Sequence, residues 1–127
     1  MDSNRRAILG AILASAAVLA AGCATPALPT PSTSAAFELA VTTDVGTDLR
    51  FVPDEVTAPP RTRVRLMFRN VSTLPHNLTF DAPIAGSTRT IVEAGGSDAI
   101  ELVTPGPGRY SFGCTIHMGM SGTLAVN

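Results

Sequence analysis

Apolar and polar residues alternate along several short segments of the chain between residue 37 and its end. In segment 37–43, Phe37, Leu39 and Val41 stand at every second position, with Glu38, Ala40 and Thr42 between and after them. In segment 61–70, Val64, Leu66 and Phe68 alternate with three arginines and a methionine. This two-residue period is typical of half-buried strands. Shorter runs of the same texture predict further strands at 77–80, 89–93, 99–103, 110–114 and 122–126.

Glycine- and proline-rich stretches separate these runs and predict turns at 52–55, 58–60, 81–86, 93–98 and 104–108. No segment after residue 36 shows a convincing helical period. Many short strands with such punctuation are typical of a β-sandwich. We therefore expect an all-β Greek-key β-sandwich, a single domain spanning residues 37–127.

The first 22 residues differ from this pattern. A basic start at Arg5 and Arg6 precedes an apolar run and then small residues, as in a secretory signal peptide. A transmembrane anchor is the alternative, but the run 7–21 is shorter than the ~20 residues that a span needs. We predict that residues 1–22 are a lipoprotein-type signal peptide of an exported protein, periplasmic or at the outer face of the cell membrane. Whether export follows the general or the twin-arginine route stays open.

Cys23 follows the letters LAAG directly, and this junction resembles the lipobox of bacterial lipoproteins. The resemblance implies that Cys23 carries a lipid that anchors the protein to a membrane. An ordinary thiol, or a disulfide with Cys114, is the alternative for an exported chain. Residues 23–36 are mostly proline, serine, threonine and alanine, so we expect a linker that buries almost nothing.

The charge of the chain argues against one class of partner. The 127 residues contain nine arginines, no lysine and ten acidic residues. Removing residues 1–22 takes away one acid and two bases, so nine acids and seven bases leave a net charge of −2. Nucleic-acid binding requires a basic surface, and we expect none.

Soft metal ligands gather near the end of the chain. Cys114, His117 and Met120 have the spacing C-x2-H-x2-M, and His76 precedes Cys114 by 38 residues. One thiolate, two imidazoles and one weak axial thioether are the donor set that favours copper. Zinc is the alternative, although structural zinc sites usually take four strong nitrogen or sulfur donors. Each residue alone would be unremarkable as a core residue, but the four together predict one copper ion per chain.

The segment YSFGCTIHMGMSGTLAV resembles the last hairpin of the cupredoxins, the small blue (type 1) copper proteins, with ligand spacing similar to amicyanin. LPHNLTF resembles the segment that carries their first histidine, and FVPDEV with MFRN is similar to an upstream stretch. The resemblance implies a Greek-key sandwich with copper at one end. Its implied equatorial ligands are His76, Cys114 and His117, with Met120 axial and Asn77 tying the ligand loop to its neighbour.

The resemblance implies a one-electron carrier that exchanges electrons with partner proteins, most simply as a monomer. A copper enzyme would need more histidines than the two present, and a four-ligand site leaves no open position for substrate, so we expect no enzymatic activity. Storage or delivery of copper to another protein remains the alternative.

Three further features have both a functional and a structural interpretation. Tyr110 follows a Pro-Gly pair and predicts a tyrosine corner, a structural role. Four apolar residues beside the histidines could form a docking patch around the solvent-facing edge of His117, or pack in the core: Leu74, Pro75, Ile116 and Met118. Four arginines could dock an acidic partner or line a solvated sheet face: Arg61, Arg63, Arg65 and Arg69.

Overall fold

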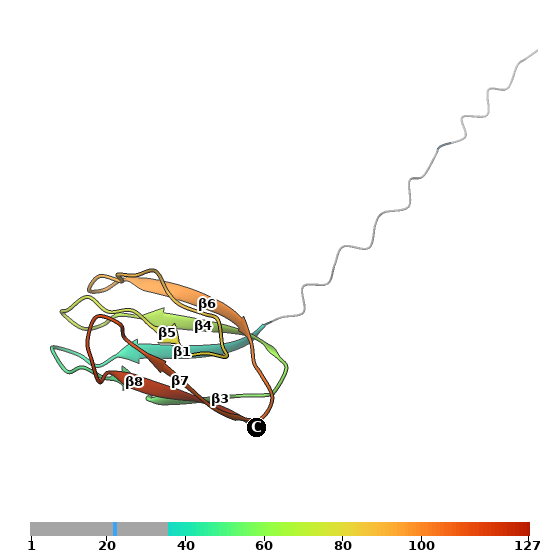
Figure 1. Cartoon of the computed structure of the whole chain (residues 1–127). Coiled ribbons are helices and arrows are strands. Elements are labelled where there is room, and N and C mark those ends of the chain that lie inside the picture. The colour runs from blue at the N-terminus through green and yellow to red at the C-terminus, as the bar shows by residue number, and fades with distance from the viewer. Residues whose placement is uncertain (1–21, 23–35) are drawn as a thin grey trace, which may run out of the picture. The chain divides into compact units, whose positions relative to one another are not determined.

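Eight strands and no helix make up the described part of the chain, which is Gly22 and residues 36–127 of the computed structural model (Figure 1). The predicted all-β fold is therefore confirmed for these residues. Almost all of the predicted signal peptide and linker, Cys23 included, lies outside them. In these described residues no helix is long and apolar enough to cross a membrane. The strands are β1 (Phe37–Thr43), β2 (Phe51–Val52), β3 (Glu55–Ala58), β4 (Arg63–Arg69), β5 (Thr79–Phe80), β6 (Ser97–Val103), β7 (Gly108–Gly113) and β8 (Ser121–Val126).

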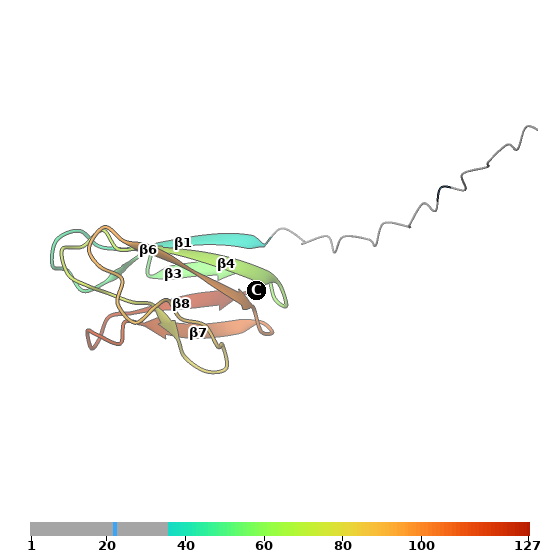
Figure 2. The same cartoon turned by 90° about the horizontal axis from the view of Figure 1, so that it is seen from above.

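The strands form two four-stranded sheets packed face to face (Figures 1 and 2). One sheet has the order β2-β1-β4-β6 and the other β3-β8-β7-β5. Two pairings are parallel, β1 with β4 and β3 with β8, and the remaining pairings are antiparallel. Neighbours in each sheet are thus often distant in sequence, as a Greek-key sandwich requires.

The core lies between the sheets and follows the alternation of β4. Val64, Leu66 and Phe68 are fully buried, whereas the residues between them are exposed on the outer face. Phe112 on β7 packs edge-on against Phe51, with ring centroids 5.1 Å apart. Such edge-to-face pairs add to the hydrophobic contribution of burial. The core therefore joins the two sheets through aromatic side chains.

Two predictions about local structure are wrong. Segment 89–93 is not a strand, because only Val92 pairs, through one isolated bridge to His76. Ile91 is half exposed there, so the segment lacks the continuous ladder that its apolar residues suggested. Conversely, β3 occupies part of the region predicted as turns at 52–55 and 58–60, since four residues between prolines suffice to pair with β8.

The connections collect at the two ends of the sandwich. Loops 44–50, 70–78 and 114–120 lie at one end, opposite the start of β1 and the C-terminus (Figures 1 and 2). At the opposite end, the Tyr110 hydroxyl donates a hydrogen bond of 2.7 Å to the carbonyl of Gly106. The predicted tyrosine corner is therefore confirmed, and it holds the turn that leads into β7.

Candidate metal centre

Two loops at one end of the sandwich supply the four predicted ligands. His76 lies in the loop 70–78, between β4 and β5. Cys114 follows the last residue of β7, and His117 and Met120 complete the loop that leads to β8. Because β7 and β5 are neighbours in one sheet, the two loops emerge side by side. The sheet thus brings together residues that are 38 positions apart in the sequence.

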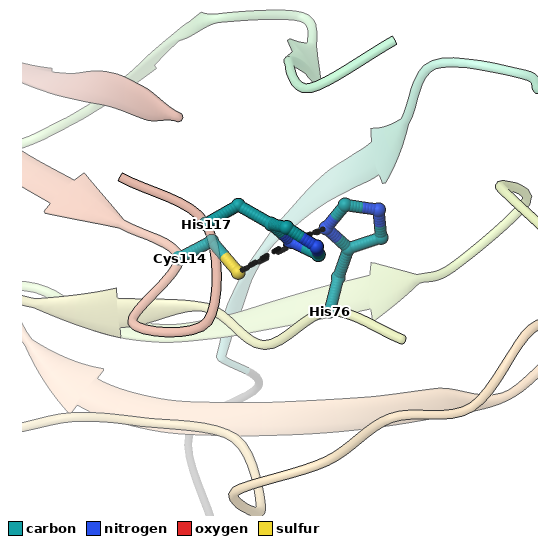
Figure 3. A group of neighbouring side chains, drawn as sticks. All are labelled: His76, Cys114 and His117. Carbon is teal, nitrogen blue, oxygen red and sulfur yellow. Dashed lines mark hydrogen bonds between the residues drawn. The ribbon is translucent and has the colours of Figure 1, made fainter. Parts of the chain in front are cut away.

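Three donor atoms converge on one point between these loops (Figure 3). The Cys114 Sγ atom lies 3.8 Å from Nδ1 of His76 and 3.7 Å from Nδ1 of His117. The two Nδ1 atoms are 3.2 Å apart. Two neutral imidazoles cannot both point lone pairs at this distance without repulsion, unless a hydrogen or a cation lies between them. The arrangement is therefore one that a bound cation stabilises.

These separations fit a single ion. A tetrahedral or trigonal site with nitrogen at about 2.0–2.1 Å and sulfur at about 2.3 Å separates its donors by roughly 3–4 Å. The three donor–donor distances of this site, 3.2, 3.7 and 3.8 Å, fall within that range. A thiolate with two imidazoles is also the soft plane that type 1 copper takes. The residues present therefore fit copper in both geometry and chemistry.

The loop that carries three of the ligands is closed by its own backbone. The Cys114 N–H donates to the Met120 carbonyl over 3.0 Å, and the Met120 N–H donates to the His117 carbonyl over 3.4 Å. These hydrogen bonds bring the backbone of Met120 next to that of Cys114, and both side chains are buried. Met118, which lies between His117 and Met120 in the sequence, is 97% exposed. The spacing and burial thus select Met120, not Met118, as the axial thioether.

His76 is completely buried and held on its backbone side by Val92. The His76 N–H donates to the Val92 carbonyl over 3.1 Å, and the Val92 N–H donates to the His76 carbonyl over 2.8 Å. Burial lowers the pKa of His76, and the nearby His117 lowers it further. The imidazole is therefore kept neutral, which is the form that binds a metal. His117 is only partly buried.

Asn77 joins the two ligand loops. Its Nδ2 donates to the Thr115 hydroxyl over 2.7 Å and to the Thr90 carbonyl over 2.8 Å. Its Oδ1 accepts the Thr115 N–H over 2.8 Å. Thr115 lies next to Cys114, so these bonds set the distance between the first histidine and the thiol. Partners that orient ligands in this way tune a metal site.

Sequence reasoning missed Ser72 and Thr115, both of which contact the ligand residues or their neighbours. Ser72 Oγ lies 3.1 Å from Nε2 of His76. In the sequence, Ser72 is marked only by lying four residues before His76. That position does not distinguish it from any other polar loop residue. Contacts of this kind depend on loop conformation, and composition does not reveal them.

The two surface features predicted from the sequence are both exposed. Ile116 and Met118 flank His117 at the surface, while Leu74 and Pro75 are half-buried, so none of the four is a core residue. The arginines of β4 line the outer face of its sheet. The register places Arg65 directly between Glu38 on β1 and Glu101 on β6, which alternates the charge across that face.

The chain matches one protein family and is similar to several solved structures. Residues 11–126 match the family described as the cupredoxin-like domain. Auracyanin B is 26% identical, with a TM-score of 0.64 over 72% of this chain and 89% of the other. A mutant plastocyanin of a fern, solved in oxidized and reduced forms, is 28% identical, with a TM-score of 0.54 over 69% and 99%.

Auracyanin A, described as a "blue" copper protein from the green thermophilic photosynthetic bacterium Chloroflexus aurantiacus, shares the fold. It is 17% identical, with a TM-score of 0.63 over 73% of this chain and all of the other. The match covers nearly the whole chain, and the two histidines, the cysteine and the methionine are positioned as a type 1 copper site, with one copper bound per domain in this family. The chain belongs to the cupredoxin-like domain family.

Proposed function

We propose that the protein is a type 1 copper protein that carries one electron at a time between partner proteins at the outer face of a bacterial membrane. The convergence of the Cys114 sulfur with Nδ1 of His76 and Nδ1 of His117, all within 4.8 Å, carries this proposal. A donor set held this closely, with a buried thioether beside it, is suited to both copper oxidation states. When bound, copper supplies the Cu(I)/Cu(II) couple.

The protein's own contribution is to hold the donors still. His76, Asn77 and Cys114 are each buried and hydrogen-bonded, His76 and Asn77 to neighbouring segments and Cys114 within its own loop, so their positions need not change when an electron arrives or leaves. The four donors leave no open position for a substrate, which favours a carrier over an enzyme. His117 is the ligand that reaches solvent, and we propose its exposed edge as the place where electrons enter and leave.

A docking patch and an anchor complete the proposal. We propose that Leu74, Pro75, Ile116 and Met118, all at least partly exposed, form an apolar patch beside His117 that suits a transient redox partner. We propose that Cys23 carries a lipid and that the protein works as a monomer. Within the described domain, β1 begins at the end of the sandwich opposite the loops that carry the ligands (Figure 1).

Optical and EPR spectra of the copper-loaded protein test the function. A thiolate in the copper plane gives an intense blue absorption band, so we expect the full chain to turn blue when Cu(II) is added. Cys114→Ser should abolish the band while the circular dichroism of the sandwich is retained. Met118→Leu is the matched control, and it should leave the spectrum unchanged because that side chain is exposed.

A pale or colourless copper complex would contradict the electron-carrier proposal and favour copper storage or delivery. Loss of the band in Met118→Leu but not in Met120→Leu would reverse the assignment of the axial ligand. For the anchor, mass spectrometry of protein extracted from membranes should show an acylated Cys23. Recovery of unmodified chain only, or of Cys23→Ala still bound to membranes, would refute lipid attachment there.

A further inference from the structure

Ser72 is a buried polar residue that the proposed function has not yet used. It lies in the loop 70–78, four residues before His76, and is 3% exposed. Its Oγ atom has three polar neighbours. They are the Gly46 carbonyl oxygen at 3.0 Å, the Leu74 nitrogen at 2.9 Å and Nε2 of His76 at 3.1 Å.

The contacts of this hydroxyl fit one tautomer of His76. A serine hydroxyl has one hydrogen to donate and two lone pairs. It can donate its hydrogen to the Gly46 oxygen, which also accepts from the Thr73 N–H and the Thr73 hydroxyl. The Leu74 N–H takes one lone pair, which leaves the other for His76. Nδ1 of His76 faces the other two donor atoms and would hold the metal, so the single hydrogen of the neutral ring is on Nε2 and can be donated to Ser72.

From these contacts we propose that Ser72 is a positioning residue for the metal centre. By accepting the Nε2–H of His76, its hydroxyl fixes the tautomer in which Nδ1 is free of hydrogen. Nδ1 is the atom that faces Cys114 and His117. The second nitrogen of a metal-bound histidine usually donates to such a partner, which fixes the ring's orientation. The inference rests on the proposed copper site and adds how its first histidine is kept ready.

Ser72 can do this because its own position is fixed from two sides. Its N–H lies 2.9 Å from Oγ1 of Thr43, at the end of β1, and 3.0 Å from Oδ1 of Asn70. Its hydroxyl reaches Gly46 in the loop 44–50. The His76 ring is thus linked through Ser72 to β1, by the Ser72 N–H, and to a loop that supplies no ligand, by the Ser72 hydroxyl.

The test compares Ser72→Ala with Thr73→Val in the full chain loaded with Cu(I). Thr73 Oγ1 donates to the same Gly46 carbonyl over 3.0 Å but does not contact His76, so Thr73→Val is the matched control. Long-range ¹H–¹⁵N NMR of the reduced, diamagnetic protein reports which nitrogen of His76 carries hydrogen and how fast it exchanges with water. Competition with a Cu(I) chelator reports the affinity.

In the wild type we expect a slowly exchanging Nε2–H on His76, with a nuclear Overhauser effect to the Ser72 β-protons. Ser72→Ala should speed this exchange and weaken copper binding about 10- to 100-fold, whereas Thr73→Val should leave both unchanged. Equal effects of the two variants would show that Ser72 only secures the loop, and would overturn the inference. So would no effect of Ser72→Ala on His76.

If Ser72→Ala does not fold, the wild-type spectrum decides alone. A His76 ring with a rapidly exchanging Nε2–H, or with its hydrogen on Nδ1, overturns the inference even when copper binds. Failure of the wild type to take up copper is seen before any variant is compared. That result would overturn the proposed function, and the inference with it.

Discussion

His76 shows how completely a single residue can be constrained. Val92 engages both of its backbone polar groups, Ser72 lies against Nε2, and Nδ1 faces the thiol of Cys114. His117 is only partly buried. The two histidines therefore have different roles. His76 is held rigidly inside the site, and His117 lies between the site and the surface.

The lowered pKa of His76 predicts how stability depends on pH. Its folded-state pKa lies below the unfolded value of about 6.5, because burial and His117 disfavour the charged ring. The unfolded chain then binds more protons, so the free energy of unfolding rises with pH in this window. We expect full stability above about pH 6.5 and a progressive loss below it, toward the folded-state pKa.

Urea denaturation of the copper-free protein across this window measures the effect. His76→Gln is the comparison, and its stability should vary less with pH between neutrality and the folded-state pKa. Asp98 also has a lowered pKa, mainly because the Arg89 N–H donates to its carboxylate, but that group titrates at lower pH. An unchanged slope in His76→Gln would mean that another group causes the pH dependence.

At the scale of elements, short strands are enough to position the ligands because hydrogen bonds between loops add to the strand pairing. β5 has two residues, yet it carries the first ligand loop into contact with β7. The segment 89–93 forms no strand, but its Val92 holds His76 and its Thr90 accepts from Asn77. The hairpin of β7 and β8 then presents the remaining ligands.

Gly122 on β8 predicts a packing constraint next to this hairpin. A Cβ atom there would lie 2.3 Å from the ring of Phe112, its cross-strand partner, and 2.9 Å from the Asp54 carbonyl. Phe112 is buried against two other aromatic rings and has little room to move. We expect Gly122→Ala to lower the free energy of unfolding by about 1–3 kcal/mol, measured by urea denaturation.

Gly106→Ala is the control for this prediction. Its added Cβ would come no closer than 3.7 Å to another residue, an ordinary contact with Arg61. We expect no change in stability there. Similar losses in both variants would point to a general cost of replacing glycine and not to a clash with Phe112.

At Arg61, replacement by glycine is expected to raise the free energy of unfolding. It precedes β4 with φ at 51°, in the left-handed region, where a side chain costs about 1–2 kcal/mol. Glycine removes this strain but adds roughly 0.5–1 kcal/mol of unfolded-state entropy. Arg61→Gly should therefore raise the unfolding free energy by up to about 1.5 kcal/mol.

Arg63→Gly is the matched control, because Arg63 is the first residue of β4, pairs with Val103 on β6 and is also exposed. Glycine weakens a paired strand, so this variant should be destabilised by roughly 0.5–1 kcal/mol. Denaturation midpoints measured side by side give the two signs. Equal destabilisation of both variants would show that Arg61 is not strained.

At the scale of the whole domain, two parts of the surface differ in character: the end with the ligand loops is apolar, and the outer face of β4 is charged. The end that carries the metal centre exposes Met118 and Ile116 beside His117. The side formed by the outer face of β4 exposes arginines, with Arg65 opposite two glutamates. Apolar surface next to the exposed ligand favours docking at the end, while alternating charges favour a solvated side.

Electron-transfer kinetics with a redox partner compare these two surfaces. We expect Arg65→Glu to leave the rate and its salt dependence unchanged. Met118→Glu places a charge in the patch and should slow transfer by roughly tenfold, which corresponds to about 1.4 kcal/mol. A strong, salt-dependent effect at Arg65 would identify the arginine face as the docking surface.

The sequence alone determined the fold class and the ligand set, because both depend on local pattern. The alternation of apolar and polar residues in the sequence predicts β4, and C-x2-H-x2-M is a spacing within one loop. It could not decide that segment 89–93 would support His76 without forming a strand, or that Ser72 would reach Nε2. Those contacts join residues whose separation is set by sheet pairing and loop conformation. Only the tertiary structure decides such long-range distances, since many sequences with the same alternation could place their loops differently.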